Sequence, residues 1–182
     1  MPMRWFSFFI LLYLAAALQM AHLGALSEHG YFHVEYLPSL VVFYALFADE
    51  SRSLLCSLII GLVYDLTSTS LLGTHTVVLA LVAWVISRVR MSIFRYNMIS
   101  QIILTLLAVM FTLSAVDILA WLAPMLIGGQ RPPELAFWQT LGLISSTGIY
   151  TAVLAPWLFK LAFLMGPLLG FESENRRRWF DG

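Results

Sequence analysis

Six apolar runs follow one another along the 182 residues, with only short polar segments between them. A helix needs about 20 apolar residues to cross a hydrocarbon layer ~30 Å thick, because it rises ~1.5 Å per residue. The runs are Trp5–Leu26, Tyr31–Ala48, Ser51–Ser70, Leu71–Val89, Met98–Leu126 and Trp138–Leu161. The pattern predicts an all-α, polytopic membrane protein with about six transmembrane helices.

The low charge of the chain excludes an ordinary soluble domain. Charged residues make up 11% of it, against roughly 25% in a typical soluble domain. We therefore expect one integral membrane bundle over residues 1–170 and a short cytoplasmic polar tail over 171–182. The segment Ala162–Phe171 is too short to cross and is expected to lie in the membrane interface. A secretory signal is an alternative for the first run, but that run continues past Ala15–Ala17 to Leu26.

Two of the six runs are weak membrane spans. The strongly apolar part of the second, Leu37–Phe47, rises only ~16 Å as a helix, so Tyr31–Tyr36 are expected in the interface. Pro38 suits the first turn of that helix. The third run contains Asp65, whose insertion costs about 3 kcal/mol. We expect this helix to depend on its neighbours.

The distribution of basic residues predicts the orientation. Lys and Arg in short loops stay on the cytoplasmic side of a membrane. With six spans and a cytoplasmic start, the other side holds only Arg131. The cytoplasmic side then holds Arg4, Arg52, Arg88, Arg90, Arg95, Lys160, Arg176, Arg177 and Arg178. Both termini are therefore expected in the cytoplasm.

Several polar side chains fall at similar depths in this arrangement. Gln19, Asp65 and His75 lie roughly 20–22 Å from the cytoplasmic ends of their helices, and Asp117 lies up to ~28 Å away. Ionisable residues inside a membrane usually face a partner or a cavity. A structural network within the bundle is the favoured interpretation. A small-ligand cavity, or a metal or catalytic centre, stays open as an alternative.

Metal, catalytic and nucleic-acid sites have little support in the sequence. The four histidines, His22, His29, His33 and His75, show no paired helical spacing, and the common hydrolase, metalloprotease and phosphate-loop motifs are missing. We expect no enzymatic activity, no cofactor and no metal. The basic residues 176–178 are more typical of a topology anchor that contacts membrane lipids than of a nucleic-acid site.

Small residues form stripes on two of the runs. Ser57 and Gly61 precede Asp65 at four-residue spacing. On the sixth run, Thr147 and Thr151 precede Ala155 at the same spacing. Small side chains let another helix approach closely. Packing within the bundle is the simpler interpretation, and a seam for a foreign helix is the other.

One stretch resembles a known family. The order Leu37-Pro38-Ser39-Leu40, and then Gly61-Leu62-Val63-Tyr64-Asp65-Leu66-Thr67-Ser68-Thr69-Ser70-Leu71-Leu72-Gly73-Thr74-His75, resembles the bacterial rod-shape-determining protein MreD. The family often has Gly at the place of Thr69 and Pro at that of Leu71 or Leu72. The motif-level match covers about Leu37–Arg90, and chain length and span number extend it.

The resemblance implies a function and partners. The family belongs to the peptidoglycan elongation machinery of the bacterial inner membrane. It pairs with MreC, which has one membrane helix, and so connects MreB filaments to the polymerase RodA and a class B penicillin-binding protein. It is also held to be similar in fold to the S components of energy-coupling factor transporters.

The expected function is therefore a non-enzymatic membrane scaffold. The alternatives are a small-molecule-binding transporter subunit and, less favoured, a small membrane hydrolase. The connection Ile127–Phe137 is either a helix connector or a contact for a periplasmic partner. Candidate residues for partner contact, packing or the polar network are Pro38, Ser57, Gly61, Asp65, Ser68, Gly73, His75, Asp117, Thr147 and Thr151.

Overall fold

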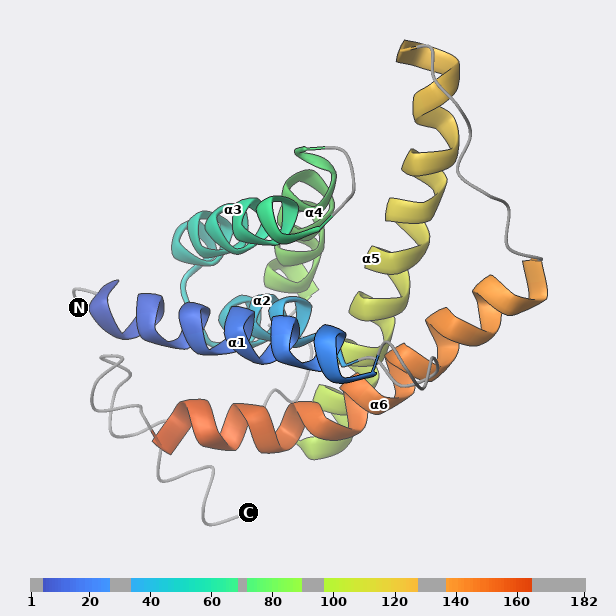
Figure 1. Ribbon diagram of the computed structural model, residues 1–182. Coiled ribbons are helices and arrows are strands. Elements are labelled where there is room, and N and C mark those ends of the chain that lie inside the picture. The colour runs from blue at the N-terminus through green and yellow to red at the C-terminus, as the bar shows by residue number, and fades with distance from the viewer. Residues whose placement is uncertain (1–4, 27–33, 69–71, 90–96, 128–136, 165–182) are drawn as a thin grey trace.

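The computed structural model describes residues 5–26, 34–68, 72–89 and 97–164, and the secondary structure in this part is helical. The helices are α1 (Trp5–Leu26), α2 (Tyr36–Phe47), α3 (Glu50–Thr67), α4 (Thr74–Val89), α5 (Met98–Ile127) and α6 (Phe137–Leu164). Each helix lies within or nearly coincides with one of the six apolar runs, so the prediction of an all-α chain is confirmed (Figure 1).

Two helices of the described part are long and apolar enough to cross a membrane. They cover Met98–Leu122 of α5 and Trp138–Ala162 of α6. The apolar stretches of α1, α2 and α4 are shorter, and α3 carries more polar residues.

Helix α2 forms the centre of the fold. All residues of Leu37–Phe47 are buried, and α2 contacts each of the other five helices. A helix that is apolar all round is stable only when it is enclosed. Its twelve residues rise about 18 Å, which is too short for a bilayer but suits the inside of a bundle.

Aromatic rings hold α1 and α6 against α2. Phe8 of α1 packs edge-on against Tyr44 with ring centroids 5.3 Å apart. Phe43 faces Phe159 of α6 at 5.5 Å. All four rings are almost completely buried.

The start of α2 holds a buried acidic residue. Tyr36 does begin the helix and Pro38 lies in its first turn, where proline is tolerated. Glu35, which is expected at the depth of the membrane interface, is only 8% exposed and is enclosed by other helices of the chain. The reason is tertiary, because its polar groups find partners on three other helices.

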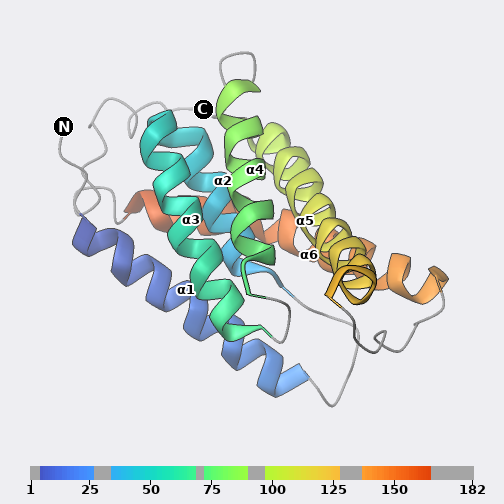
Figure 2. The same cartoon turned by 90° about the horizontal axis from the view of Figure 1, so that it is seen from above.

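Helices α5 and α6 form the least enclosed region. Figure 1 shows the second half of α5 and the first half of α6 spreading away from the other helices. Helix α6 passes through Pro156 without ending and changes direction along its length, as expected when a proline removes one helical hydrogen bond. Viewed from above, α3 and α4 lie side by side, and α4 lies between α3 and α5 (Figure 2).

Candidate functional site

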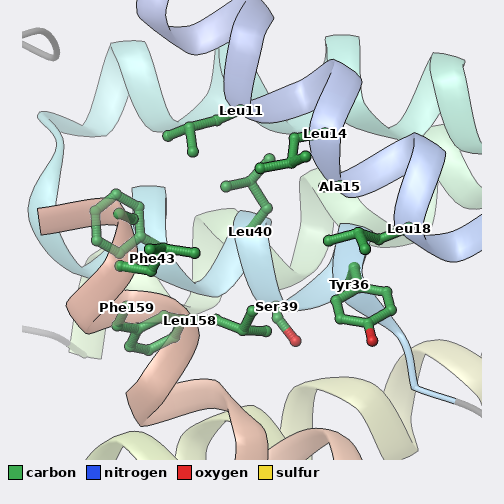
Figure 3. A pocket seen from close by; sticks show the side chains of 12 residues that line it. Leu11, Leu14, Ala15, Leu18, Tyr36, Ser39, Leu40, Phe43, Leu158 and Phe159 are labelled. Carbon is green, nitrogen blue, oxygen red and sulfur yellow. The ribbon is translucent and has the colours of Figure 1, made fainter. Parts of the chain in front are cut away.

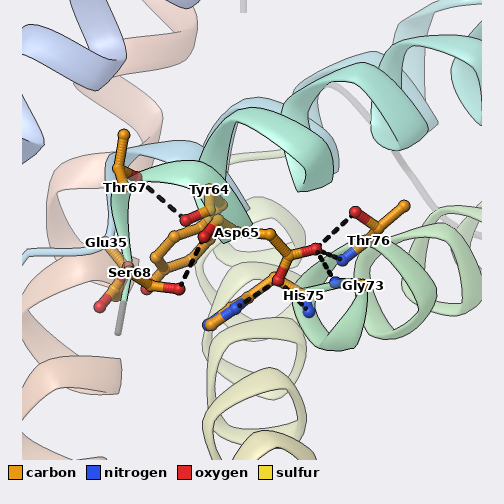
Figure 4. A network of polar contacts seen from close by, with 8 residues as sticks. All are labelled: Glu35, Tyr64, Asp65, Thr67, Ser68, Gly73, His75 and Thr76. Carbon is orange, nitrogen blue, oxygen red and sulfur yellow. Dashed lines mark hydrogen bonds and ion pairs between the residues drawn. The ribbon is translucent and has the colours of Figure 1, made fainter. Parts of the chain in front are cut away.

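Asp65, in the last turns of α3, is the hub of a buried polar site (Figure 4). Its carboxylate accepts hydrogen bonds from the backbone N–H groups of Gly73, His75 and Thr76 at 2.9, 2.9 and 3.0 Å. The Thr76 hydroxyl donates at 2.6 Å, and Nδ1 of His75 lies 3.0 Å away. One side chain thus holds the beginning of α4.

The geometry follows from the needs of a helix N-terminus. The first N–H groups of a helix have no partner within it, and they carry a partial positive charge. A nearby residue usually caps them, but here Asp65 reaches them from the preceding helix. Its side chain is fully buried, so these donors replace the water that a carboxylate loses on burial.

Glycines at two positions make this approach possible. A Cβ on Gly61 would lie 2.5 Å from the Thr76 Cα, so α3 and α4 pack backbone to backbone there. Gly73, in the turn before α4, has φ = +95°, a conformation that residues with side chains rarely adopt. Together they bring the end of α3 within hydrogen-bond distance of the start of α4.

A second buried carboxylate, Glu35, lies at the entrance to α2. It accepts hydrogen bonds from the Tyr64 hydroxyl at 2.6 Å and from the Gln19 amide at 2.7 Å. The side-chain oxygen of Gln19 accepts a hydrogen bond from the Leu37 backbone N–H at 3.1 Å. The Glu35 backbone N–H donates to the Thr151 hydroxyl at 3.0 Å. Glu35 therefore connects α1, α3 and α6 at the start of α2.

Aromatic contact joins the two carboxylate centres. The Tyr64 ring lies against the His75 ring, with centroids 4.0 Å apart and planes inclined by 31°. We call the connected set Gln19, Glu35, Tyr64, Asp65, His75, Thr76 and Thr151 the polar network. It links α1, α3, α4 and α6 around the start of α2.

Most of the other sequence-predicted residues lie in helix contacts of the same chain. Ser57 is buried and its hydroxyl donates to the Leu54 carbonyl at 2.8 Å. The Ser68 backbone N–H donates to the Tyr64 carbonyl at the end of α3. Thr147 is buried on the inner face of α6, as is Thr151. Both small-residue stripes thus face neighbouring helices of this chain.

Asp117 does not join the polar network. It is exposed on α5, beside Ser114 and Thr140 at a groove between α5 and α6. The shared depth inferred from helix rise therefore does not bring the two aspartates together. Depth along a helix leaves open the direction in which each side chain points.

Some predictions fall on residues outside the described part. These are Arg4, His29, His33, Arg90, Arg95, the connection through Arg131, residues 165–171 of the expected interfacial segment, and the tail with its three arginines. For His22 only the backbone is described. Within the described residues, no three His, Cys, Asp or Glu side chains come together as a metal site.

Sequence reasoning missed four members of the polar network as site residues. Gln19 was noted only for its depth, and Tyr64 only as part of a motif. Glu35 was assigned to the interface, and Thr76 was not considered. A usable signal existed for Tyr64 and Thr76, since each adjoins a candidate residue in sequence. The role of Glu35 depends on α6, which is distant in the chain.

A small apolar pocket opens between α1, α2 and α6 (Figure 3). Leu11, Leu40 and Phe159 are among its lining residues, and its cavity volume is about 60 Å³. Pockets for small ligands usually measure roughly 300–1,000 Å³. This space is therefore a packing gap that suits apolar groups.

Comparison with known proteins identifies the family. The family model of the rod shape-determining protein MreD matches residues 1–165, which include all six helices. No curated protein and no solved structure matches the chain, so the expected similarity to transporter S components has no support from known structures. The family is membrane-associated, and the apolar α5 and α6 fit this. The chain belongs to the MreD family, whose role is in determining rod shape.

Proposed function

We propose that this protein is a non-enzymatic scaffold of the peptidoglycan elongation complex. It binds an MreC-like protein with one membrane helix and so connects MreB to RodA and a class B penicillin-binding protein. It lies in the inner membrane as one six-helix unit over residues 1–170, with both termini and the tail 171–182 in the cytoplasm.

The observation that carries this proposal is that the buried polar side chains form hydrogen bonds with one another and with the backbone of the same chain. Among the described residues, the donors to the Asp65 carboxylate all belong to the start of α4, and the Glu35 carboxylate accepts hydrogen bonds from Tyr64 and Gln19. Groups that bind one another within a closed network stabilise a shape. This favours a scaffold over a protein that holds a substrate at these residues.

Two features support the membrane arrangement. Large apolar side chains remain exposed on the outer faces of the helices, for example Leu58, Leu81 and Leu107, as a lipid-facing surface requires. Arg88 pairs with Glu50 at 3.3 Å, so the start of α3 and the end of α4 lie at the same end of the bundle. That end is the cytoplasmic one by the distribution of arginines.

Replacement of Asp65 tests the scaffold role. We expect Asp65→Ala to lose co-purification with the MreC-like partner and to fail to restore rod shape in cells that lack the wild-type gene. Asp49→Ala is the matched control, because its side chain is 75% exposed and pairs with Arg52 in the adjoining turn.

Size-exclusion chromatography of the variant by itself separates misfolding from loss of binding. Full co-purification and normal rods with Asp65→Ala would remove Asp65 from this role.

A small-molecule-binding transporter subunit is the second candidate. The observation in its favour is that two buried carboxylates, Glu35 and Asp65, gather at one end of the bundle. Thermal-shift measurements of the purified protein against vitamins and metal ions test it. A reproducible stabilising ligand, lost on Glu35→Gln, favours transport over the scaffold.

A further inference from the structure

Asp117 differs from the other acidic residues inside the helices. Within the described residues its carboxylate makes no hydrogen bond or ion pair, although it lies in the more apolar of the two helices that are long enough to cross a membrane. An ionisable group at membrane depth is costly and normally faces a partner or a water-filled cavity. Asp117 is therefore met either by water in an adjoining cavity or by a group from outside the described part of the bundle.

A groove beside Asp117 provides the space for such a partner. It lies between α5 and α6 and has a cavity volume of about 320 Å³. Ser114, Asp117 and Thr140 supply its polar atoms, and Trp121 and Leu141 are among its apolar walls. Figure 1 shows this part of the two helices leading away from the other helices. The groove residues Ile118, Trp121 and Leu141 are exposed, so the groove is open to the outside of the bundle.

The shape and chemistry of the groove suit a helix. Two neighbouring helices with an apolar surface between them offer the ridges and grooves into which a third helix packs. Hydroxyl and carboxylate groups on such a surface form hydrogen bonds across helices. The negative charge of Asp117 selects a partner helix with a lysine or an arginine at this depth.

A second copy of this chain does not provide that cation from its described helices. Helix α5 begins just after α4 ends, so Asp117 lies ~28 Å from the end of the bundle that holds Arg88 and Arg52. Lys160 is 16 residues or more beyond the part of α6 that faces Asp117. Two copies in one membrane share their orientation, so these cations stay at the far end.

We propose that the groove between α5 and α6 receives the membrane-spanning helix of the scaffold's single-helix partner, and that a lysine or arginine of that helix pairs with Asp117. The inference rests on the proposed function, because it assumes that such a partner binds. It adds where the partner binds and which charge it carries.

Photocrosslinking in the purified complex locates the partner. A photoreactive amino acid replaces Ile118 or Leu141 in the groove, or Leu58 or Leu81 on the exposed faces of α3 and α4, in the full-length chain bound to the MreC-like protein. We expect adducts with the partner's membrane helix from the two groove positions, about tenfold more abundant than from the two controls.

Charge exchange tests the ion pair. Asp117→Lys is expected to weaken co-purification by about tenfold, and a Lys or Arg→Asp change in the partner helix restores it. Asp49→Lys, at an exposed site, is the control that leaves binding unchanged.

The outcomes separate the two proposals. If the wild-type chain and the MreC-like protein form no complex, the proposed function and this inference both fail. If the complex forms but adducts arise only from Leu58 or Leu81, the inference fails and the scaffold stands. Groove adducts only with lipid, or only with a second copy of the chain, also overturn the inference.

Discussion

Two aspartates lie within apolar helices of this chain and have opposite surroundings. Asp65 is fully buried and accepts five hydrogen bonds from residues at the start of α4. Asp117 is exposed at the groove between α5 and α6 and has no partner among the described residues. An aspartate thus stabilises the contact between α3 and α4, whereas the aspartate between α5 and α6 has no hydrogen-bond partner among the described residues. A carboxylate that is satisfied within the chain maintains the fold, whereas one without a partner among the described residues is available for a contact with another molecule.

The largest effect is expected at Asp65. Asp65→Ala leaves three backbone N–H groups and the Thr76 hydroxyl without their acceptor in a buried site. A buried donor left without its acceptor costs about 1–3 kcal/mol of unfolding free energy, and here several lose theirs at once. Thermal unfolding of the purified protein in detergent measures this. An unchanged midpoint would mean that the α3–α4 contact holds without the carboxylate.

Close packing at Gly61 gives the next largest effect. Gly61→Ala places a Cβ 2.5 Å from the Thr76 Cα and forces α3 away from α4, at a cost of about 1–3 kcal/mol. Gly142→Ala on α6 is the matched control, because a Cβ there meets nothing within 4 Å. We expect that control to be neutral or slightly stabilising. Equal effects at the two glycines would contradict the close approach of α3 and α4.

A smaller effect is expected at Tyr64. Tyr64→Phe keeps the ring against His75 but removes the hydrogen bond to Glu35. The Gln19 amide still donates to that carboxylate, so the loss is expected at about 1–2 kcal/mol. Unfolding of Tyr64→Phe, Gln19→Leu and the double variant shows whether the two donors act together. Strict additivity of the two changes would argue against a connected network.

The smallest effect on the isolated chain is expected at Asp117. Asp117→Asn removes a charge that no described residue pairs with, so stability changes by less than about 0.5 kcal/mol. The same unfolding assay measures it beside Asp65→Asn, which is expected to be clearly destabilised. A large loss at Asp117→Asn would place this residue with Asp65 and remove the contrast between the two regions.

The sequence predicted the candidate site only in part. It singled out Asp65, Gly61, Gly73 and His75, which the structure brings together at the junction of α3 and α4. It did not find the centre around Glu35. The pairing of Glu35 with Gln19, Tyr64 and Thr151 joins segments far apart in the chain, and helix periodicity carries no information about such pairing.

The sequence by itself determined which segments are helices, since a long apolar run with few charges has only one good way to satisfy its backbone in an apolar environment. The tertiary structure decided that the short α2 lies at the centre and that Asp65 faces inward while Asp117 faces outward. The physical reason is that the rotation of each helix about its axis is set by packing against its neighbours. Only that rotation determines whether a carboxylate meets a donor of its own chain.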